Sequence, residues 1–166
     1  MTGMIPRKSR ERNTYVNYLK KAEKFYENME GCVKEGNYDA AALAGIHSAI
    51  SLIDALLIYK EGVVCASMNH EDSVKLLVEL IKEPEVGEAS KHAVEVLKLK
   101  RSVESLDCLT TENQALSIQK HVSRLHSWVK KLLPDDNPPY SVSKKNPNDK
   151  IQERPKRAYR KSKISR

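Results

Sequence analysis

Apolar residues recur at intervals of three and four positions along most of the chain up to residue 133, which is the spacing of one face of an α-helix. These intervals predict five helices, at about residues 13–34, 37–59, 69–83, 85–103 and 111–133. Residues that cap or end helices separate them: Gly36, Asn37, Asp39, Gly62, Asn69, Pro84, Thr110, Thr111 and Pro134. No stretch shows the alternation of a β-strand. The pattern therefore predicts an all-α fold, an up-and-down four-helix bundle with an additional short helix.

The second predicted helix is apolar on more than one face, so we expect it at the centre of the bundle. Its apolar run, residues 40–59, also has about the length of a membrane span. Asp54 lies near the middle of that run, where a carboxylate would cost roughly 2.5–3.5 kcal/mol in a bilayer. The helix is therefore predicted to be buried in protein, with no membrane involved. Either a second copy of the chain or the other helices of the same chain would cover its apolar faces.

The charges divide the 166 residues into three parts. Residues 1–13, a basic N-terminal arm, hold four basic side chains and one acidic side chain, and residues 134–166, the tail, hold ten basic and four acidic ones. Residues 14–133, the predicted bundle, hold fifteen basic and seventeen acidic side chains, although the whole chain has a formal charge of +7. A nearly neutral body with basic ends argues against a protein that coats nucleic acid over its whole surface.

The tail combines five prolines with few large apolar residues, so it is predicted to be disordered when the protein is alone. Its last thirteen residues contain seven cations, one tyrosine and no acidic residue. Such cations neutralise phosphates with a strong dependence on salt, and a tyrosine stacks on an unpaired base. The candidate nucleic-acid-binding residues are Arg154, Lys156, Arg157, Tyr159, Arg160, Lys161, Lys163 and Arg166. A solubilising tail, or one that binds an acidic protein surface, is the alternative.

Several short runs follow one another in a recognisable order through the body. They are Gly36-Asn37-Tyr38-Asp39-Ala40-Ala41, Ile46-His47-Ser48-Ala49, Asp54-Ala55-Leu56, Gly62, His70-Glu71-Asp72 and Leu76-Leu77. A looser continuation runs through Leu99-Lys100-Arg101, Thr110 to Ala115 and Trp128 to Leu132. This series resembles the HEPN family, the higher eukaryotes and prokaryotes nucleotide-binding domain, over about residues 14–133. The resemblance implies a bundle of four long helices and a short one that is often dimeric. The family includes RNA-cleaving toxins, partners of nucleotidyltransferases and non-catalytic binding modules.

Catalytic members of that family carry an arginine followed, after four to six intervening residues, by a histidine that serves proton transfer. None of the five histidines here has an arginine at that distance before it. No catalytic residue is therefore assigned, and the predicted function is a non-catalytic binding or assembly module whose basic tail contacts RNA, DNA or a complex that contains nucleic acid. The alternative is a HEPN-type ribonuclease toxin paired with a nucleotidyltransferase antitoxin, in which Arg101 or His126 would support cleavage.

His47, Ser51 and Asp54 lie four and three positions apart and share one side of the second predicted helix. A serine triad would also need an oxyanion site and a nucleophile on a strained turn, which a straight helix does not supply. We therefore expect His47 and Asp54 to be buried polar groups joined by hydrogen bonds, with His70 or Arg101 as further partners. These four residues form the candidate polar pocket of the body.

Cys32, Cys65 and Cys108 are odd in number and far apart, so neither a disulfide framework nor a zinc site is predicted. The run from His70 to Asp72 lacks the second histidine of a helical zinc site, and the six glycines are too scattered for a phosphate-binding loop. The sequence thus predicts no metal and no cofactor. It favours a cytoplasmic protein whose partners are a second copy of itself, nucleic acid and a protein such as a nucleotidyltransferase.

Overall fold

The computed structural model describes residues 3–105 and 107–134, which form five α-helices, a short 3-10 helix and two short strands. The helices are α1 (Tyr15–Lys34), α2 (Tyr38–Glu61), α3 (Glu71–Leu80), α4 (Val86–Glu104) and α5 (Glu112–Leu132). The 3-10 helix η1 spans Arg12–Thr14, and the strands are β1 (Arg7–Ser9) and β2 (Val63–Cys65). The predicted helical bundle with one short helix is confirmed. Residues 135–166, to which the prediction of a disordered tail applies, lie outside the described residues.

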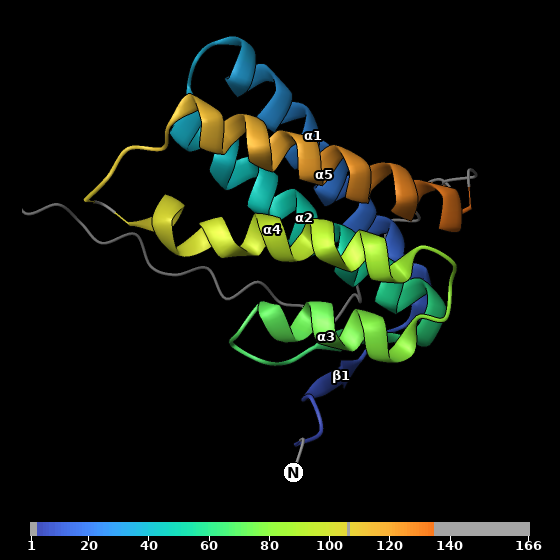
Figure 1. The fold of residues 1–166 in the computed structure, drawn as a ribbon. Helices are drawn as coiled ribbons and strands as arrows, with labels where there is room; N and C mark the ends of the chain where they lie inside the picture. The colour runs from blue at the N-terminus through green and yellow to red at the C-terminus, as the bar shows by residue number, and fades with distance from the viewer. Residues whose placement is uncertain (1–2, 106, 135–166) are drawn as a thin grey trace, which may run out of the picture.

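The four long helices lie alongside one another, and α3 lies beside α4 at one edge of the bundle (Figure 1). The central helix is α2, which contacts each of the other four helices. Fourteen of its 24 residues are buried, among them Ile46, Ile53 and Leu56. Burial of each such side chain contributes roughly 1.5–3 kcal/mol relative to exposure. The prediction of a central helix that is mostly buried in protein is therefore confirmed.

Close packing of α2 against its neighbours depends on two small residues. A Cβ atom at Gly45 would lie 2.5 Å from Cγ2 of Ile118 in α5 and 2.8 Å from Sδ of Met29 in α1, so only glycine allows this approach. The buried Ser48 hydroxyl donates a hydrogen bond to the backbone carbonyl of Ala22 in α1 at 2.9 Å. These contacts hold one side of α2 against both α1 and α5.

The ends of α2 and α5 follow the capping residues of the sequence. The side-chain oxygen of Asn37 accepts a hydrogen bond from the backbone N–H of Ala40, and Gly62 ends α2 in a left-handed conformation with φ of 66°. Thr111 and Gln114 form a reciprocal capping box at the start of α5. The sequence offered Asn37 or Asp39 and Thr110 or Thr111 as these caps, and the structure has Asn37 and Thr111. Such signals act within one helical turn, which is why the sequence could indicate them.

The expectation that no strand occurs is wrong for two short segments. β1 and β2 form an antiparallel pair in which Lys8 lies opposite Val64. The pairing continues past the strands, because the backbone N–H of Arg10 donates a hydrogen bond to the Gly62 carbonyl at 2.7 Å. Strands of three residues are too short to show an alternating pattern, and their partners are more than fifty residues apart in the chain. The periodicity of the sequence therefore could not reveal them.

The basic N-terminal segment is attached to the bundle by these strands and by side chains. The guanidinium of Arg12 donates a hydrogen bond to the backbone carbonyl of Tyr59 at 3.2 Å, and the Tyr15 and Tyr59 rings lie 5.0 Å apart between centroids. Arg7 forms an ion pair with Glu79 of α3 at 3.6 Å. Arg10 and Arg12 therefore lie beside the C-terminal end of α2, whereas Arg7 lies beside α3.

Candidate functional site

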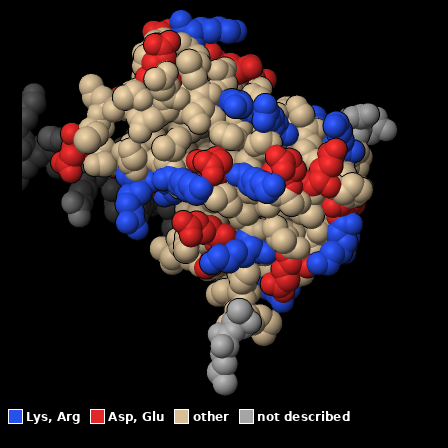
Figure 2. Space-filling model, viewed as in Figure 1, with Lys and Arg blue, Asp and Glu red and all other residues tan. Residues whose placement is uncertain are grey.

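The surface of the bundle carries both signs of charge in close alternation. Figure 2 shows acidic and basic side chains side by side across the visible face. Among the described residues, the ion pairs include Arg7–Glu79, Lys60–Glu83, Lys75–Asp72, Lys91–Glu88, Lys98–Glu95, Lys100–Glu104 and Lys130–Glu23. Exposed pairs of this kind contribute little stability, about 0–1 kcal/mol each, but they neutralise the lysines involved. This face therefore offers no continuous basic groove.

One side of α2 is open to solvent over its middle turns. Leu43, His47, Ile50 and Asp54 follow one another at spacings of three and four residues, and each side chain is exposed or half-buried. Most of the remaining residues of α2 are buried. We call these four residues the open stripe of α2. It contains both α2 members of the predicted polar pocket.

Asp54 is a half-buried carboxyl group on the open stripe. Burial raises its pKa to about 6, because the ionised form loses hydration there, and the positive charge of Arg10 partly opposes this shift. Arg10 is held in place by its backbone hydrogen bond to Gly62. A carboxyl group with this pKa exchanges a proton close to neutral pH, and such perturbed groups concentrate at functional sites.

His47 is exposed, and its ring stacks on Phe25 of α1 with centroids 5.3 Å apart and an angle of 26° between the planes. Within the described residues no hydrogen bond joins His47 to Asp54, whose charge partner is Arg10. The prediction that the two residues form a buried, hydrogen-bonded pair is therefore wrong. The helical spacing places both on one side of α2, but it cannot show that this side faces solvent.

His70 and Arg101, the other two residues of the predicted pocket, line a separate open pocket of about 480 Å³. It lies between the segment before α3 and the last turns of α4, where Lys100 and Glu104 also contribute to its wall. Burial lowers the pKa of His70; Lys100 adds to the decrease, Glu104 opposes it, and His47 lowers it further. Arg101 is exposed at the surface of α4. We call this cavity the α3–α4 pocket.

The predicted single buried pocket is thus two neighbouring features on the surface. Asp54 and His47 belong to the open stripe, whereas His70 and Arg101 belong to the α3–α4 pocket. The electrostatic interaction between His47 and His70 shows that the two features are close enough to influence each other. Together they provide an acid that titrates near neutral pH and several cations that solvent reaches. This chemistry suits the binding of a charged partner.

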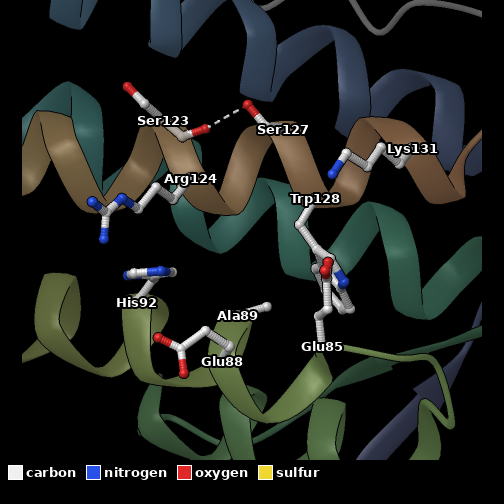
Figure 3. A pocket seen from close by; sticks show the side chains of 9 residues that line it. All are labelled: Glu85, Glu88, Ala89, His92, Ser123, Arg124, Ser127, Trp128 and Lys131. Atoms are coloured by element: carbon white, nitrogen blue, oxygen red, sulfur yellow. Dashed lines mark hydrogen bonds between the residues drawn. The ribbon is translucent and has the colours of Figure 1, made fainter.

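A second group of titratable side chains lies between α4 and α5, and sequence reasoning missed it. The Nδ1 atoms of His92 and His121 are 2.9 Å apart, so a hydrogen bond joins the two imidazoles. His92 also lines an open pocket of about 410 Å³, where it lies near Glu88 and opposite Arg124 (Figure 3). Trp128 lies at the other end of this pocket. The two histidines are 29 residues apart, and only the packing of the helices brings them together.

The five helices coincide with a known protein family. The profile of the HEPN domain matches residues 15–132, from the first residue of α1 to the last residue of α5. The chain belongs to the HEPN family. No curated protein and no solved structure gives a match. The resemblance seen in the sequence is thus confirmed, and β1 and η1 lie before the matched residues.

His126 occupies a packing position inside the HEPN domain. Its ring stacks on Tyr26 of α1 with centroids 4.5 Å apart, and the Tyr26 hydroxyl forms a hydrogen bond of 2.9 Å with the hydroxyl of Ser123. Burial lowers the pKa of His126, while Glu23 raises it and Lys130 lowers it. His126 is therefore a contact between α1 and α5, and it does not line the α3–α4 pocket.

The predicted nucleic-acid-binding residues of the tail, from Arg154 to Arg166, lie outside the described part of the HEPN protein. Within the described ranges, no group of three or more His, Cys, Asp or Glu side chains could hold a metal ion. The same residues contain one helix, α2, that is long and apolar enough to cross a membrane. Most of its apolar window is buried inside the domain, as in the core helix of a soluble protein.

Proposed function

We propose that this HEPN protein is a non-catalytic module for binding and assembly in the cytoplasm, whose basic tail contacts RNA, DNA or a complex that contains nucleic acid. The bundle would position a partner or a second copy of the chain. The tail would add affinity that does not depend on base sequence, because its cations interact with phosphates.

The observation that carries this proposal is the contrast between the cations of the bundle and those of the tail. Lys91 and Lys98 on α4 each have a carboxylate within 3.1 and 2.6 Å, respectively. In residues 154–166, seven cations occur with no acidic residue among them. A polyanion therefore gains more from contact with the tail than with an equal number of bundle lysines, because it does not have to displace a carboxylate.

Charge neutralisation in the full chain tests the role of the tail. We replace its seven terminal cations by glutamine and measure binding to labelled single- and double-stranded RNA and DNA. For the wild-type chain, about seven phosphate contacts predict an affinity that falls roughly 10³-fold or more between about 50 and 200 mM salt. The variant should lose most of the affinity and most of this salt dependence. The control variant, Lys91→Gln with Lys98→Gln, should bind as the wild type does.

A deletion of all residues after Pro134 should reproduce the effect of neutralisation. Equal affinity in the truncated and full chains would contradict the proposed role of the tail. A complex with a protein partner that survives nuclease treatment, and that also forms with the neutralised variant, would instead identify a scaffold that binds only protein.

The open stripe of α2 is the surface that we propose for a second copy of the chain. Leu43 is 41% exposed there although it is a large apolar residue, and Ile50 lies two turns further along. Ile50→Lys should convert a dimer to a monomer in sedimentation velocity, because it places a charge in the contact. Val94→Lys, at a position on α4 with 37% exposure, is the matched control and should leave the dimer intact. A monomeric wild type would contradict this assignment.

The alternative function is a ribonuclease toxin paired with a nucleotidyltransferase antitoxin. It requires growth arrest on expression and RNA cleavage that depends on Arg101 or His126. Arg101 lines the α3–α4 pocket, whereas His126 packs against Tyr26, and this separation favours the non-catalytic proposal. RNA cleavage by the wild type that is lost in Arg101→Ala or His126→Ala would favour the ribonuclease instead. Co-purification of a nucleotidyltransferase that prevents growth arrest would do the same.

A further inference from the structure

His92 and His121 bring two imidazole nitrogens together between α4 and α5. Their Nδ1 atoms are 2.9 Å apart, their ring centroids are 5.2 Å apart, and the ring planes meet at 40°. Both side chains are half-buried, so solvent and dissolved ions reach them. Neutral imidazole is the commonest protein ligand for transition metals and binds them through either ring nitrogen. Two such nitrogens on facing helices supply a pair of adjacent coordination positions.

We propose that His92 and His121 bind a divalent transition-metal ion through their Nδ1 atoms, in place of the hydrogen bond that joins them. Metal–imidazole bonds are about 2.0–2.1 Å long, so at the present separation the nitrogen–metal–nitrogen angle would be roughly 90°. Adjacent positions in square-planar and octahedral shells have this angle, whereas a tetrahedral zinc site would need the nitrogens about 3.3 Å apart. The geometry therefore favours Ni²⁺ or Cu²⁺ over Zn²⁺.

Carboxylates on α4 flank the histidine pair. Glu88 lies one turn before His92 and Glu95 one turn after it, and electrostatic interactions link Glu88 to His92 and Glu95 to His121. Their negative charges favour a cation between the imidazoles. Each carboxylate forms an ion pair with an exposed lysine three residues away, a pairing worth about 1 kcal/mol or less, and Arg124 also interacts electrostatically with Glu88. Either carboxylate can therefore turn to the ion as a third ligand, and water completes the shell.

Two features limit the strength of this site. The described residues hold no ready group of three metal-binding side chains, so one ligand has to reorient when the ion binds. Lys120 and Arg124 on α5 also place positive charge near His121. We therefore expect an affinity weaker than that of a structural zinc centre. The bound ion would join α4 to α5 directly.

Calorimetric titration of the full chain without an affinity tag, using NiCl₂ in a buffer that does not bind metals, tests the site. We expect one Ni²⁺ per chain, and a loss of affinity of about tenfold or more in both His92→Asn and His121→Asn. His126→Asn is the matched control, because it changes another half-buried histidine of α5, and it should bind Ni²⁺ as the wild type does. Absence of binding by the wild type, or equal binding by His121→Asn, would overturn the proposal.

Electron paramagnetic resonance of the Cu²⁺-loaded wild type gives an answer that does not depend on the folding of a variant. Two imidazole nitrogens in the equatorial plane should couple to the copper electron spin. A spectrum with one such nitrogen or none would overturn the proposal. Ni²⁺ should also raise the melting temperature of the wild type and of His126→Asn but not that of His92→Asn, and an equal increase in all three would show that the ion binds elsewhere.

Discussion

The covered and open sides of α2 serve different purposes in the same helix. On the covered side, Gly45 and Leu56 are enclosed by neighbouring helices, and their burial stabilises the bundle. On the open side, Leu43 keeps much of its surface in solvent, and Asp54 has a pKa raised to about 6 by burial. The covered side provides stability, whereas the open side holds a carboxyl group whose ionisation reduces it. Groups that cost stability in this way are candidates for function.

The largest effect is expected on the covered side. Leu56 is completely buried, so Leu56→Ala removes its packing and leaves a cavity. We expect a loss of about 2–5 kcal/mol in the free energy of unfolding, measured by urea denaturation at pH 7. A loss below about 1 kcal/mol is the size of an ordinary surface effect. It would contradict the claim that the covered side of α2 contributes more stability than the open side.

Asp54→Asn should have the next largest effect, with the opposite sign. The variant keeps the shape of the side chain but removes the cost of an ionised carboxylate on the open stripe. A pKa raised from 3.8 to about 6 corresponds to a gain of at most about 3 kcal/mol in the free energy of unfolding at pH 7. The measurement is urea denaturation of both proteins at a series of pH values.

The dependence on pH provides the control for this prediction. Because the folded state holds the Asp54 proton more tightly than the unfolded state, the contribution of this group is most favourable below about pH 4 and is lost as the pH rises to about 6. Asp54→Asn should therefore match the wild type in acid and exceed it at neutral pH. A difference that is the same at every pH would rule out ionisation as its cause.

Gly45→Ala should be destabilising although alanine normally favours a helix. The new Cβ atom would meet Ile118 and Met29, and this overpacking outweighs the helix preference, for a net loss of about 1–2 kcal/mol. Gly31→Ala in α1 is the matched control, because nothing lies within 4 Å of a Cβ atom there, and it should gain up to about 1 kcal/mol. Thermal denaturation followed by circular dichroism measures the stability of both variants. If both substitutions stabilised the protein, or both destabilised it, the close approach at Gly45 would be contradicted.

The smallest effect belongs to the open stripe. Leu43→Ser should change the free energy of unfolding by no more than about 0.5 kcal/mol, because 41% of the leucine surface is already in solvent. The same substitution should weaken self-association if the stripe is the contact between two copies. Urea denaturation at low protein concentration separates the two effects, and a large loss there would assign Leu43 to the core.

The helices and several of their ends could be predicted because their signals are local. Asn37 caps the start of α2 within one turn, and the apolar spacing of each helix repeats every three or four residues. The HEPN resemblance also rests on short runs in a fixed order. His47 and Asp54 were correctly placed on one side of α2 for the same reason, since that relation depends only on helical geometry.

Relations between distant parts of the chain could not be predicted in this way. The pairing of β1 with β2, the approach of Arg10 to Asp54 and the contact of His92 with His121 each join separate elements. Whether a side of α2 is covered also depends on where the other four helices pack, and this left His47 exposed.

Periodicity, capping residues and charge distribution were therefore sufficient to predict a helical body with basic ends, because each is a property of neighbouring residues, and the resemblance of several short runs added the HEPN family. The separation of Asp54 from His70 and Arg101, and the pairing of two histidines across α4 and α5, were decided by tertiary packing. Packing brings together residues that share no local pattern. It also sets the burial that raises the pKa of Asp54 and leaves one stripe of the central helix open.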